Sequence, residues 1–395
     1  MGDPGAPPLA GVTVLDFTGN IAGPSATLIL RDMGARIVKV EPLEGDVARG
    51  WLPLADGVST VFSAFNRGKE SIALDARSPR GREIVLRLAE RADVFVESMR
   101  PGKAARLGLG ARDLRGRNPA LIYASVNAFG DVGPLGGLPG FDAIVQAYSG
   151  IMDLTGHPDG PPSRVGTAVI DVGSGMWAAL AILGALLQRA ADGQGREVET
   201  TMLGTAVGFL MHHLAAVRLA GSVPQRLGTA QHNFAPYEAF EAADRPVMVG
   251  VSNDGMWGRM RDALDVADDP RFATNDDRVA NRAELVAALE AAAAALPAAE
   301  VVKRLAASGV PATVVRTVDE LAADPQLDAL GLWGRTPEGF ALARAPVAGA
   351  AGDLGAVPAC GAHSAAILEE IGLGPEIDAL VDEGVVRADG PRLRS

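Results

Sequence analysis

Short apolar runs alternate with helical patterns through the first half of the chain, and no other feature restricts the fold as strongly. The predicted buried strands are residues 12–17, 36–41, 94–96 and 121–126, and the predicted helices are residues 24–33 and 82–91. Pro24 begins the first helix and Gly34 follows it, as is typical of helix ends. Strands that alternate with helices form a parallel sheet covered by helices, so we predict an α/β fold with a Rossmann-like large domain.

The second half of the chain has a different pattern. An apolar helix is predicted over 201–220 and a polar loop over 221–233. Strands are predicted over 247–251 and 309–315, with acidic, alanine-rich helices over 257–307 between them. A last helix is predicted over 364–370. A chain of 395 residues is long enough for two domains. We therefore predict a large domain over 1–203, a smaller α/β domain over 204–332, and a C-terminal segment over 333–395 that returns to the large domain.

Composition excludes several classes of protein. The chain is 48% hydrophobic and 21% charged, which is typical of a globular protein. A formal net charge of −12 argues against general nucleic-acid binding. The single cysteine excludes an internal disulfide and a cysteine-rich zinc site. We see no secretion signal, and we interpret the apolar stretch 172–187 as a buried helix, so we expect a cytoplasmic protein with no membrane partner.

Basic residues are concentrated in one part of this acidic chain. Lys and Arg outnumber Asp and Glu between residues 64 and 118, in two clusters: Arg67, Lys69, Arg77, Arg80 and Arg82, and then Arg100, Lys103 and Arg106. Guanidinium groups suit phosphate because two of their donors can bind two oxygens together. The clusters follow Leu74 and Val96, which we take as the ends of adjacent strands, where ligands bind in such sheets. A solvated helix face is the ordinary explanation for any one of these charges, but their grouping is consistent with a small polyphosphate ligand.

The first βαβ unit also resembles half of a nucleotide-binding domain. It ends at Glu41, which in a dinucleotide-binding protein would contact a ribose. However, residues 19–23 are Gly-Asn-Ile-Ala-Gly and not Gly-x-Gly-x-x-Gly, so the dinucleotide signal is weak. His212 and His213 invite a metal hypothesis, but neighbouring helical residues point about 100° apart, so we predict no metal site.

Asp171 is the residue with the clearest chemical potential. It ends an apolar run and precedes an alanine- and leucine-rich segment, where an ionised carboxylate is costly unless it is held or used. Two interpretations remain open: a helix N-cap, and a nucleophile kept ionised by the helix dipole. Gly173 and Gly175 lack side chains, so we expect that a bulky electrophile can approach Asp171.

A series of motifs then matches a known family. In order, they include Val14-Leu-Asp-Phe, Asp32-Met-Gly-Ala, Val38-Lys-Val-Glu-Pro, Asn66-Arg-Gly-Lys, Arg100-Pro-Gly, Gly156-His-Pro-Asp-Gly-Pro-Pro, the Asp171 segment, Asn233-Phe-Ala-Pro-Tyr and Gly309-Val-Pro-Ala. Each motif alone is weak, but a dozen in order are specific. Across essentially its whole length the chain resembles the class III CoA-transferases, which include formyl-CoA and carnitine CoA-transferases and α-methylacyl-CoA racemases.

The resemblance implies a large CoA-binding domain, a small domain and an interlocked homodimer. It implies coenzyme A, bound as acyl-CoA, and a small organic acid as the partners of the protein. The residues that match the family's CoA contacts are Ile21, Ala22, Leu74, Asp75, Arg77, Ser98, Met99 and Arg106. Arg77 and Arg106 are the phosphate candidates. Some transferases have Gln, Arg and Asn where this chain has Ile21, Pro42 and Ser98, which leaves the acyl preference and some CoA contacts open.

The resemblance also implies the reaction. Asp171 matches the catalytic aspartate, so the protein is expected to be an acyl-CoA:carboxylate CoA-transferase with an aspartyl anhydride and an aspartyl thioester as intermediates. Phe141 and Asn253 match substrate positions, and Ile21, Phe141 and Trp257 suggest an apolar pocket for a medium-sized organic acid. A racemase would need histidine where Phe141 stands and tends to have Glu near Asn253, so transfer is favoured over racemisation. A CoA-thioester isomerase, lyase or hydrolase that uses the same aspartate remains an alternative.

Overall fold

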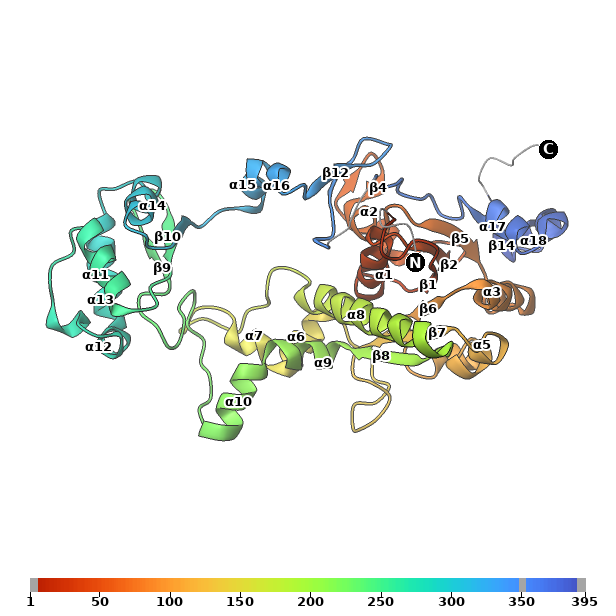
Figure 1. The fold of residues 1–395 in the computed structure, drawn as a ribbon, viewed down its shortest axis with the longest axis horizontal. Coiled ribbons are helices and arrows are strands. Elements are labelled where there is room, and N and C mark those ends of the chain that lie inside the picture. Colours follow the sequence, from red (N-terminus) through yellow and green to blue (C-terminus); the bar gives the residue numbers. More distant parts are fainter. Residues whose placement is uncertain (1–5, 348–352, 389–395) are drawn as a thin grey trace. The chain divides into compact units, whose positions relative to one another are not determined.

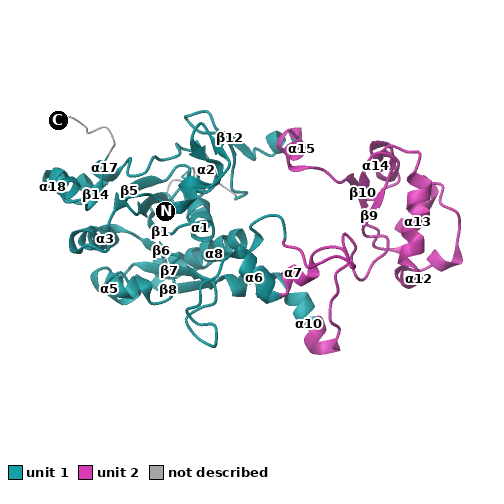
Figure 2. Ribbon diagram, turned by 180° about the vertical axis from the view of Figure 1, so that it is seen from behind, with its two compact units in different colours: residues 1–149, 165–215, 326–395 teal, residues 150–164, 216–325 magenta. Residues whose placement is uncertain are grey.

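The computed structural model describes residues 6–347 and 353–388 and divides into two compact units (Figure 2). Unit 1 consists of Met1–Ser149, Val165–Ala215 and Gln326–Ser395, and unit 2 of Gly150–Arg164 and Ala216–Pro325. The compact units therefore differ in their limits from the domains proposed above. Residues 150–164 belong to unit 2, and residues 204–215 and 326–332 belong to unit 1. The predicted domain limits of 1–203, 204–332 and 333–395 stay a prediction.

A seven-stranded sheet forms the centre of unit 1 (Figure 1). Its order is β14-β5-β2-β1-β6-β7-β8, and every neighbouring pair is parallel except β14 with β5. The strands are β1 (Thr13–Phe17), β2 (Arg36–Glu41), β5 (Glu70–Leu74), β6 (Val94–Glu97), β7 (Ile122–Asn127), β8 (Glu197–Thr201) and β14 (Val386–Arg387). The mixed α/β class and the parallel central sheet are therefore confirmed. The prediction that the strands ending near Leu74 and Val96 are adjacent is wrong, because β2 and β1 lie between β5 and β6.

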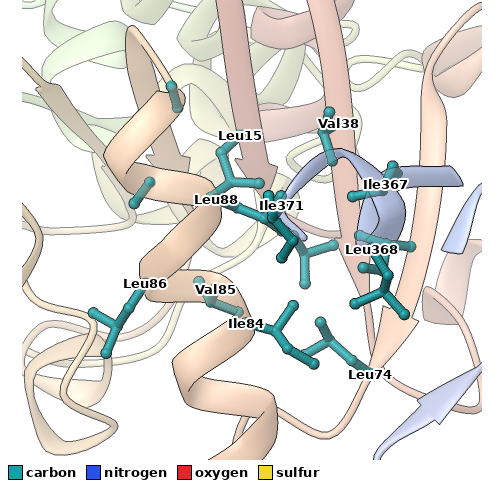
Figure 3. Packing of buried hydrophobic residues seen from close by; sticks show 14 of the residues in the cluster. Leu15, Val38, Leu74, Ile84, Val85, Leu86, Leu88, Ile367, Leu368 and Ile371 are labelled. Atoms are coloured by element: carbon teal, nitrogen blue, oxygen red, sulfur yellow. The ribbon is translucent and has the colours of Figure 1, made fainter. Parts of the chain in front are cut away.

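Helices cover both faces of this sheet, because alternate residues of each strand point to opposite sides. Val14 packs in a core shared with α1 (Ala22–Asp32) and α8 (Val169–Asp192). Leu15 packs in the other core, with α3 (Pro79–Arg91), α5 (Ala111–Arg117) and α17 (Ser364–Glu370). Figure 3 shows this second core, in which Leu88 of α3 and Ile371 after α17 lie near Leu15. The C-terminal segment thus completes a core that the first ninety or so residues begin.

The expectation that residues 172–187 form a buried helix is only half right. The helix α8 is longer than expected and packs against α1 on one side. Its other side exposes Met176, Trp177, Leu180 and Leu187. By length and apolar composition alone, α8 would be able to cross a membrane, and 44% of its most apolar window is buried within the chain. Two bent helix pairs, Met202–Phe209 with Met211–Ala220 and Arg282–Ala293 with Ala298–Ala307, would also be long and apolar enough if each pair formed one span.

The rest of unit 1 and the junctions consist of short elements. They are η1 (Val47–Gly50), β3 (Leu54–Ala55), β4 (Val58–Ser59), α2 (Thr60–Asn66), α4 (Lys103–Arg106), α6 (Asp142–Ser149), α9 (Met202–Phe209), α10 (Met211–Ala220), α16 (Pro325–Ala329), β12 (Trp333–Arg335), β13 (Ala341–Ala343), η3 (Gly374–Glu376) and α18 (Ile377–Asp382). The predicted apolar helix over 201–220 is thus two helices, α9 and α10, which meet at a bend of 68°.

Unit 2 contains a small antiparallel sheet in the order β11-β10-β9. Its elements are α7 (Ile151–Leu154), β9 (Ala239–Glu241), β10 (Pro246–Val249), α11 (Asp254–Ala263), η2 (Pro270–Phe272), α12 (Asn275–Ala280), α13 (Arg282–Ala293), α14 (Ala298–Ala307), β11 (Ala312–Val314) and α15 (Val318–Ala322). Trp257 lies in the core of this unit, edge-on to Phe272 and under the guanidinium of Arg278. The expectation that Trp257 walls a substrate pocket is therefore wrong.

Candidate active site

The central feature of the candidate site is the point where the strand order of the large sheet reverses. The chain leaves β1 for β2 on one side and later returns to β6 on the other. Ligands of α/β sheets bind at the carboxyl ends of strands at such a point. Here Gly19, which follows β1, donates its amide to the Ser98 hydroxyl, which follows β6, at 3.2 Å. The structure thus brings the predicted CoA residues Ser98 and Ile21 into neighbouring loops of one crevice edge.

The helix α1 begins at this edge. Ile21 is its N-cap residue and provides no side-chain hydrogen bond, so the first amides of α1 have no side-chain acceptor from the cap. Gly23 is required by close packing, because a Cβ there would lie 2.4 Å from Cβ of Thr18. Free amides at a helix start favour an oxygen-rich or anionic group of a ligand. Ala22, another predicted CoA contact, is the first residue of this helix.

A buried ion network lies under the loop after β1. Lys69 Nζ is 3.0 Å from Asp16 Oδ2, and Lys39 Nζ is 2.8 Å from Asp46 Oδ2 and donates to the carbonyl of Thr18. Burial opposes ionisation of Asp16, but the ammonium groups of Lys69 and Lys39 hold its pKa well below the usual range. Burial lowers the pKa of Lys69 to about 8, even though Asp16 favours the charged form. This network fixes the loop that leads to Ile21.

The basic clusters separate into structural and free members. Arg67 is fully buried and forms two hydrogen bonds with Asp32, and Lys69 is fully buried as described. Arg80 pairs with Glu376 and Glu383. These three members of the first cluster therefore have structural partners and are not available to a phosphate ligand. Four basic residues of the two clusters form no ion pair within the described residues: Arg82, Arg100, Lys103 and Arg106.

One unpaired arginine, Arg82, packs against the segment that carries another, Arg106. The Cβ position of Gly108 is 3.2 Å from Cδ of Arg82, and that of Gly102 is 3.3 Å from Nη1 of Arg106. The segment after β6 therefore packs against the first turns of α3, which follows β5. Arg77 also follows β5, with an 80% exposed side chain that pairs with Asp75 at 2.7 Å. Leu74 is buried in the core, so any contact between this residue and CoA would use its backbone.

Asp171 is the third residue of α8, so the expectation that it is the N-cap is wrong. The residue that fills this role is Asp142, the first residue of α6. Its Oδ2 accepts the amides of Ile170 at 2.8 Å and of Asp171 at 3.2 Å. The other oxygen, Oδ1, accepts the Gln146 amide at 2.5 Å, and Gln146 in turn accepts the Val165 amide. The helix start is thus already neutralised by a carboxylate other than Asp171.

The carboxylate of Asp171 has no hydrogen-bond partner in the described part of the chain. Burial and, to a smaller extent, the nearby negative charge of Asp142 together raise the pKa of Asp171 to about 7. The helix dipole was expected to favour the charged form of Asp171, but Asp142 accepts two amides at the helix start, and the pKa of Asp171 is raised and not lowered. The result is a poorly solvated carboxyl group that changes charge near neutral pH.

The glycines near Asp171 allow α8 to pack closely against its neighbours. A Cβ on Gly173 would lie 2.6 Å from Cζ of Phe209, and one on Gly175 would lie 1.9 Å from the Ser25 hydroxyl and 2.9 Å from the Ala22 carbonyl. Both glycines are thus needed for packing, and the approach of a bulky electrophile to Asp171 stays a prediction. Because residues four apart share a helix face, Asp171 lies on the side of α8 that faces the start of α1. The structure thereby brings Asp171 to the same side of unit 1 as Ile21 and Ala22.

The two predicted substrate residues have different surroundings. Phe141, 66% exposed, directly precedes α6 in unit 1. Asn253 belongs to unit 2 and is the N-cap of α11, where its side chain accepts the Met256 amide at 2.9 Å. In the same unit, the loop over 225–232 packs against the Gly156–Pro162 motif: Gly228 donates to the Gly156 carbonyl, and Arg226 to that of Gly160.

Two alternative hypotheses depended on Glu41 as a ribose contact and on the His212–His213 pair as metal ligands. Glu41 is buried and accepts hydrogen bonds from Arg49, the Ser71 hydroxyl and the Asp46 amide, so it has no free oxygen for a ribose. The rings of His212 and His213 lie 3.9 Å apart, yet no group of three or more His, Cys, Asp or Glu side chains in the described ranges is arranged for a metal ion.

Sequence reasoning missed Asp142, Gln146 and Glu97. Asp142 follows Phe141, and its residue type alone gives no signal of a structural role. Nothing in a single sequence links Asp142 with Asp171, which lie 29 residues apart. Glu97 ends β6 as one of many charged residues, and its burial became visible only in the folded chain.

Comparison with known proteins decides the family. Residues 9–364 match CoA-transferase family III. The chain belongs to this family. The CoA-transferase is 41% identical over 324 residues to acetyl-CoA:oxalate CoA-transferase of Acetobacter aceti, covering 81% of this chain and 83% of that protein. It is 37% identical to succinate–glutarate CoA-transferase of Agrobacterium fabrum, covering 82% and 84%. A CAIB/BAIF family protein from Brucella suis has a similar structure, with a TM-score of 0.85, 37% identity, and coverage of 93% of this chain and 100% of that one.

Membership of this family makes the protein an enzyme that uses CoA thioesters as substrates. The solved structure of a Mycobacterium tuberculosis protein, Rv3272, is also similar, with a TM-score of 0.82 at 34% identity and coverage of 92% of this chain and 99% of that one.

Proposed function

We propose that this CoA-transferase moves CoA between two organic acids through covalent intermediates on Asp171. The observation that carries the proposal is the environment of the Asp171 carboxyl group. It is poorly solvated, has no hydrogen-bond partner within the described residues, and lies on the α8 face toward the start of α1. A carboxylate with few hydrogen bonds is a stronger nucleophile than a solvated one.

The reaction begins when an oxygen of Asp171 attacks the carbonyl carbon of the donor thioester. The carbon–sulfur bond breaks, CoA leaves as a thiolate, and a mixed anhydride remains. The thiolate attacks the aspartyl carbonyl and releases the donor acid as a carboxylate, which gives an aspartyl–CoA thioester. The acceptor carboxylate then attacks that carbonyl and frees the thiolate. The thiolate takes the acyl group from the second anhydride, which restores the Asp171 carboxylate.

The role of Asp142 in this scheme is to position Asp171 and to set its charge. By accepting the amides of Ile170 and Asp171, it fixes the first turn of α8. Its negative charge, added to burial, raises the pKa of Asp171. Attack requires the ionised form, so the fraction of active enzyme grows as the pH rises through this pKa.

A first prediction concerns the pH profile. With both substrates saturating, kcat should rise with pH through the pKa of Asp171, which is about 7 in the free protein. In Asp142→Asn the neighbouring negative charge is absent, so the midpoint should move to lower pH. Asp153→Asn, on an exposed side chain of unit 2, is the matched control and should leave the midpoint unchanged. A midpoint that stays in place in Asp142→Asn would contradict the proposed coupling.

The CoA site is proposed to extend along the carboxyl edge of the sheet. Ile21, Ala22, Ser98 and Met99 would surround the thioester and pantetheine near Asp171. Arg77 and Arg106, with Arg82, would bind the phosphates. Arg82 and Arg106 have no carboxylate partner within the described residues, and Arg77, although paired with Asp75, has an 80% exposed side chain. Asp75 would hold Arg77 in place through their 2.7 Å contact.

A second prediction tests this assignment. Arg106→Gln should raise the KM for acyl-CoA about 10- to 100-fold, the usual worth of a hydrogen bond to a charged group, with little change in kcat. Arg80→Gln is the control, because Arg80 is already paired with two glutamates. Equal effects of the two substitutions in steady-state kinetics would place the phosphates elsewhere.

The acids are proposed to be small dicarboxylates. Relatives of 34–41% identity are named for oxalate, glutarate, succinate and mesaconate. The expectation of a medium-sized acid in an apolar pocket, for which Trp257 was one of three supports, stays an untested alternative. A panel of these four acids with acetyl-CoA and succinyl-CoA as donors would identify the pair.

The protein is also proposed to act as an interlocked homodimer. In unit 1, the contacting helices α6, α8 and α9, with the residue that precedes α6, expose large apolar side chains. They are Phe141, Ile144, Tyr148, Met176, Trp177, Leu180, Val207 and Phe209. A patch of this kind commonly marks an interface. Sedimentation equilibrium of the purified chain would give a single species of twice the chain mass; a monomer would contradict the proposal.

Intact-protein mass spectrometry after incubation with acyl-CoA, with and without borohydride, tests the covalent pathway. Wild type should gain the mass of CoA less one water, and borohydride should convert the aspartyl thioester to an alcohol. Both changes should be lost in Asp171→Ala. An unmodified wild-type protein that still binds CoA would favour an isomerase, lyase or hydrolase that does not form the thioester.

A further inference from the structure

Glu97 is a buried carboxyl group in the centre of the large sheet, next to the proposed CoA site. It is the last residue of β6, and its side chain is on the same sheet face as Phe17 of β1 and Ser125 of β7, its register partners. Glu97 is 6% exposed. Its Oε2 accepts the amide of Met99 at 2.6 Å, a short bond to the loop that follows the strand.

Other buried carboxylates of this sheet have cationic partners. Asp16 is paired with Lys69, and Glu41 with Arg49. Within the described residues, no lysine or arginine pairs with Glu97. Its negative charge is therefore compensated only by the Met99 amide, which makes that hydrogen bond more important for Glu97 than for the paired carboxylates.

The surroundings of Glu97 make it titrate near neutrality. The pKa of Glu97 is raised to about 7. Burial is the largest cause and the negative charge of Glu199 on β8 acts in the same direction, whereas the hydrogen bond from the Met99 amide opposes them. The phenol of Tyr123, on the same face of β7, also interacts electrostatically with Glu97. Asp16 of β1 points to the opposite face, since it precedes Phe17 in the strand.

The loop that Glu97 holds is connected to the reaction centre. Ser98 accepts the Gly19 amide from the loop that leads to Ile21 and α1. A change in the hydrogen bond from the Met99 amide to Glu97 would therefore affect the loop after β6 and, through Ser98, the loop after β1. An ionised carboxylate binds an amide more strongly than a neutral carboxylic acid does.

We propose that the ionised Glu97 carboxylate holds the Ser98–Met99 segment in the conformation that binds CoA, so that protonation of Glu97 weakens CoA binding. The inference rests on the proposed CoA site, and it makes Glu97 a positioning residue that acts through the loop. It adds a dependence of affinity on pH that is separate from the dependence of the chemical step on Asp171.

The test is calorimetric titration of the full-length Asp171→Ala protein with CoA between pH 6 and pH 8. Removal of Asp171 prevents both covalent chemistry and its own titration. If only the ionised form of Glu97 binds, the Kd for CoA should be about tenfold higher at pH 6 than at pH 8. Adding Glu97→Gln should remove most of this change, because the amide oxygen still accepts from Met99 but does not titrate. What remains is the titration of the ligand's own phosphate, with a second pKa of about 6.

Glu199→Gln in the same Asp171→Ala background is a second test that leaves Glu97 in place. The loss of the nearby negative charge should lower the pKa of Glu97 and move the weakening of CoA binding to lower pH. The same pH dependence with and without Glu97→Gln, or an unmoved midpoint in Glu199→Gln, would overturn the inference while the proposed function stands. A protein that binds no CoA at any pH would instead contradict the proposed function.

Discussion

Asp171→Asn should lower kcat for CoA transfer by about 10⁴-fold or more, the order of loss when a covalent nucleophile is removed. The amide is nearly the same size but does not attack a thioester. Affinity for CoA should change little, since Asp171 is not among the residues proposed to bind it. Steady-state kinetics together with direct CoA binding would measure the two effects separately.

The same substitution should not destabilise the protein. The pKa of Asp171 is raised by burial, so folding disfavours its charged form, and the cost is greatest above pH 7. Asp171→Asn should therefore have an equal or higher Tm than wild type at pH 8. Asp192→Asn, at the other end of α8 in an exposed pair with Arg196, is the matched control for activity. Transfer by Asp171→Asn within tenfold of wild type would exclude Asp171 as nucleophile.

Lys69→Met should cost about 3–5 kcal/mol of folding free energy, the usual consequence of leaving a buried charge without its partner. Lys69 and Asp16 are both fully buried, and Lys69 Nζ also donates to Thr27 and Asn66. Its removal leaves the carboxylates Asp16 and Asp46 with Lys39 as the nearest cation. Chemical denaturation at constant pH would measure the loss.

Two comparisons test the cause. Arg80→Met breaks an exposed ion pair and should leave stability nearly unchanged. The double substitution Asp16→Asn/Lys69→Met should recover part of the loss, because the unpaired negative charge is removed as well. A double variant that is less stable than Lys69→Met would show that hydrogen bonding by Asp16, and not charge pairing, dominates.

Many elements of the fold were predictable because they depend on local patterns. The strand over 36–41 and the helix over 364–370 have the predicted limits, since apolar periodicity and turn residues determine both. The order of the strands was not predictable in this way. The interpretation of β5 and β6 as neighbours failed because pairing depends on contacts between distant segments, and the chain places β2 and β1 between them.

For the candidate site, sequence patterns identified Asp171 and the unpaired Arg106, but assigned Arg67 and Lys69 to the same ligand. Whether a charged side chain faces a ligand or a buried partner depends on burial, which the types and spacing of residues do not specify. Asp32, the partner of Arg67, is 35 residues away in the chain.

The sequence by itself determined the α/β class, the family and the identity of the candidate nucleophile, because these follow from local periodicity and from motifs in a fixed order. Only the tertiary structure decided how that nucleophile is tuned. Asp142 takes the amides at the start of α8, and burial, with the charge of Asp142, brings the pKa of Asp171 to about 7. Electrostatic energies depend on distance and on exclusion of water, and both arise only when residues far apart in the chain are brought together.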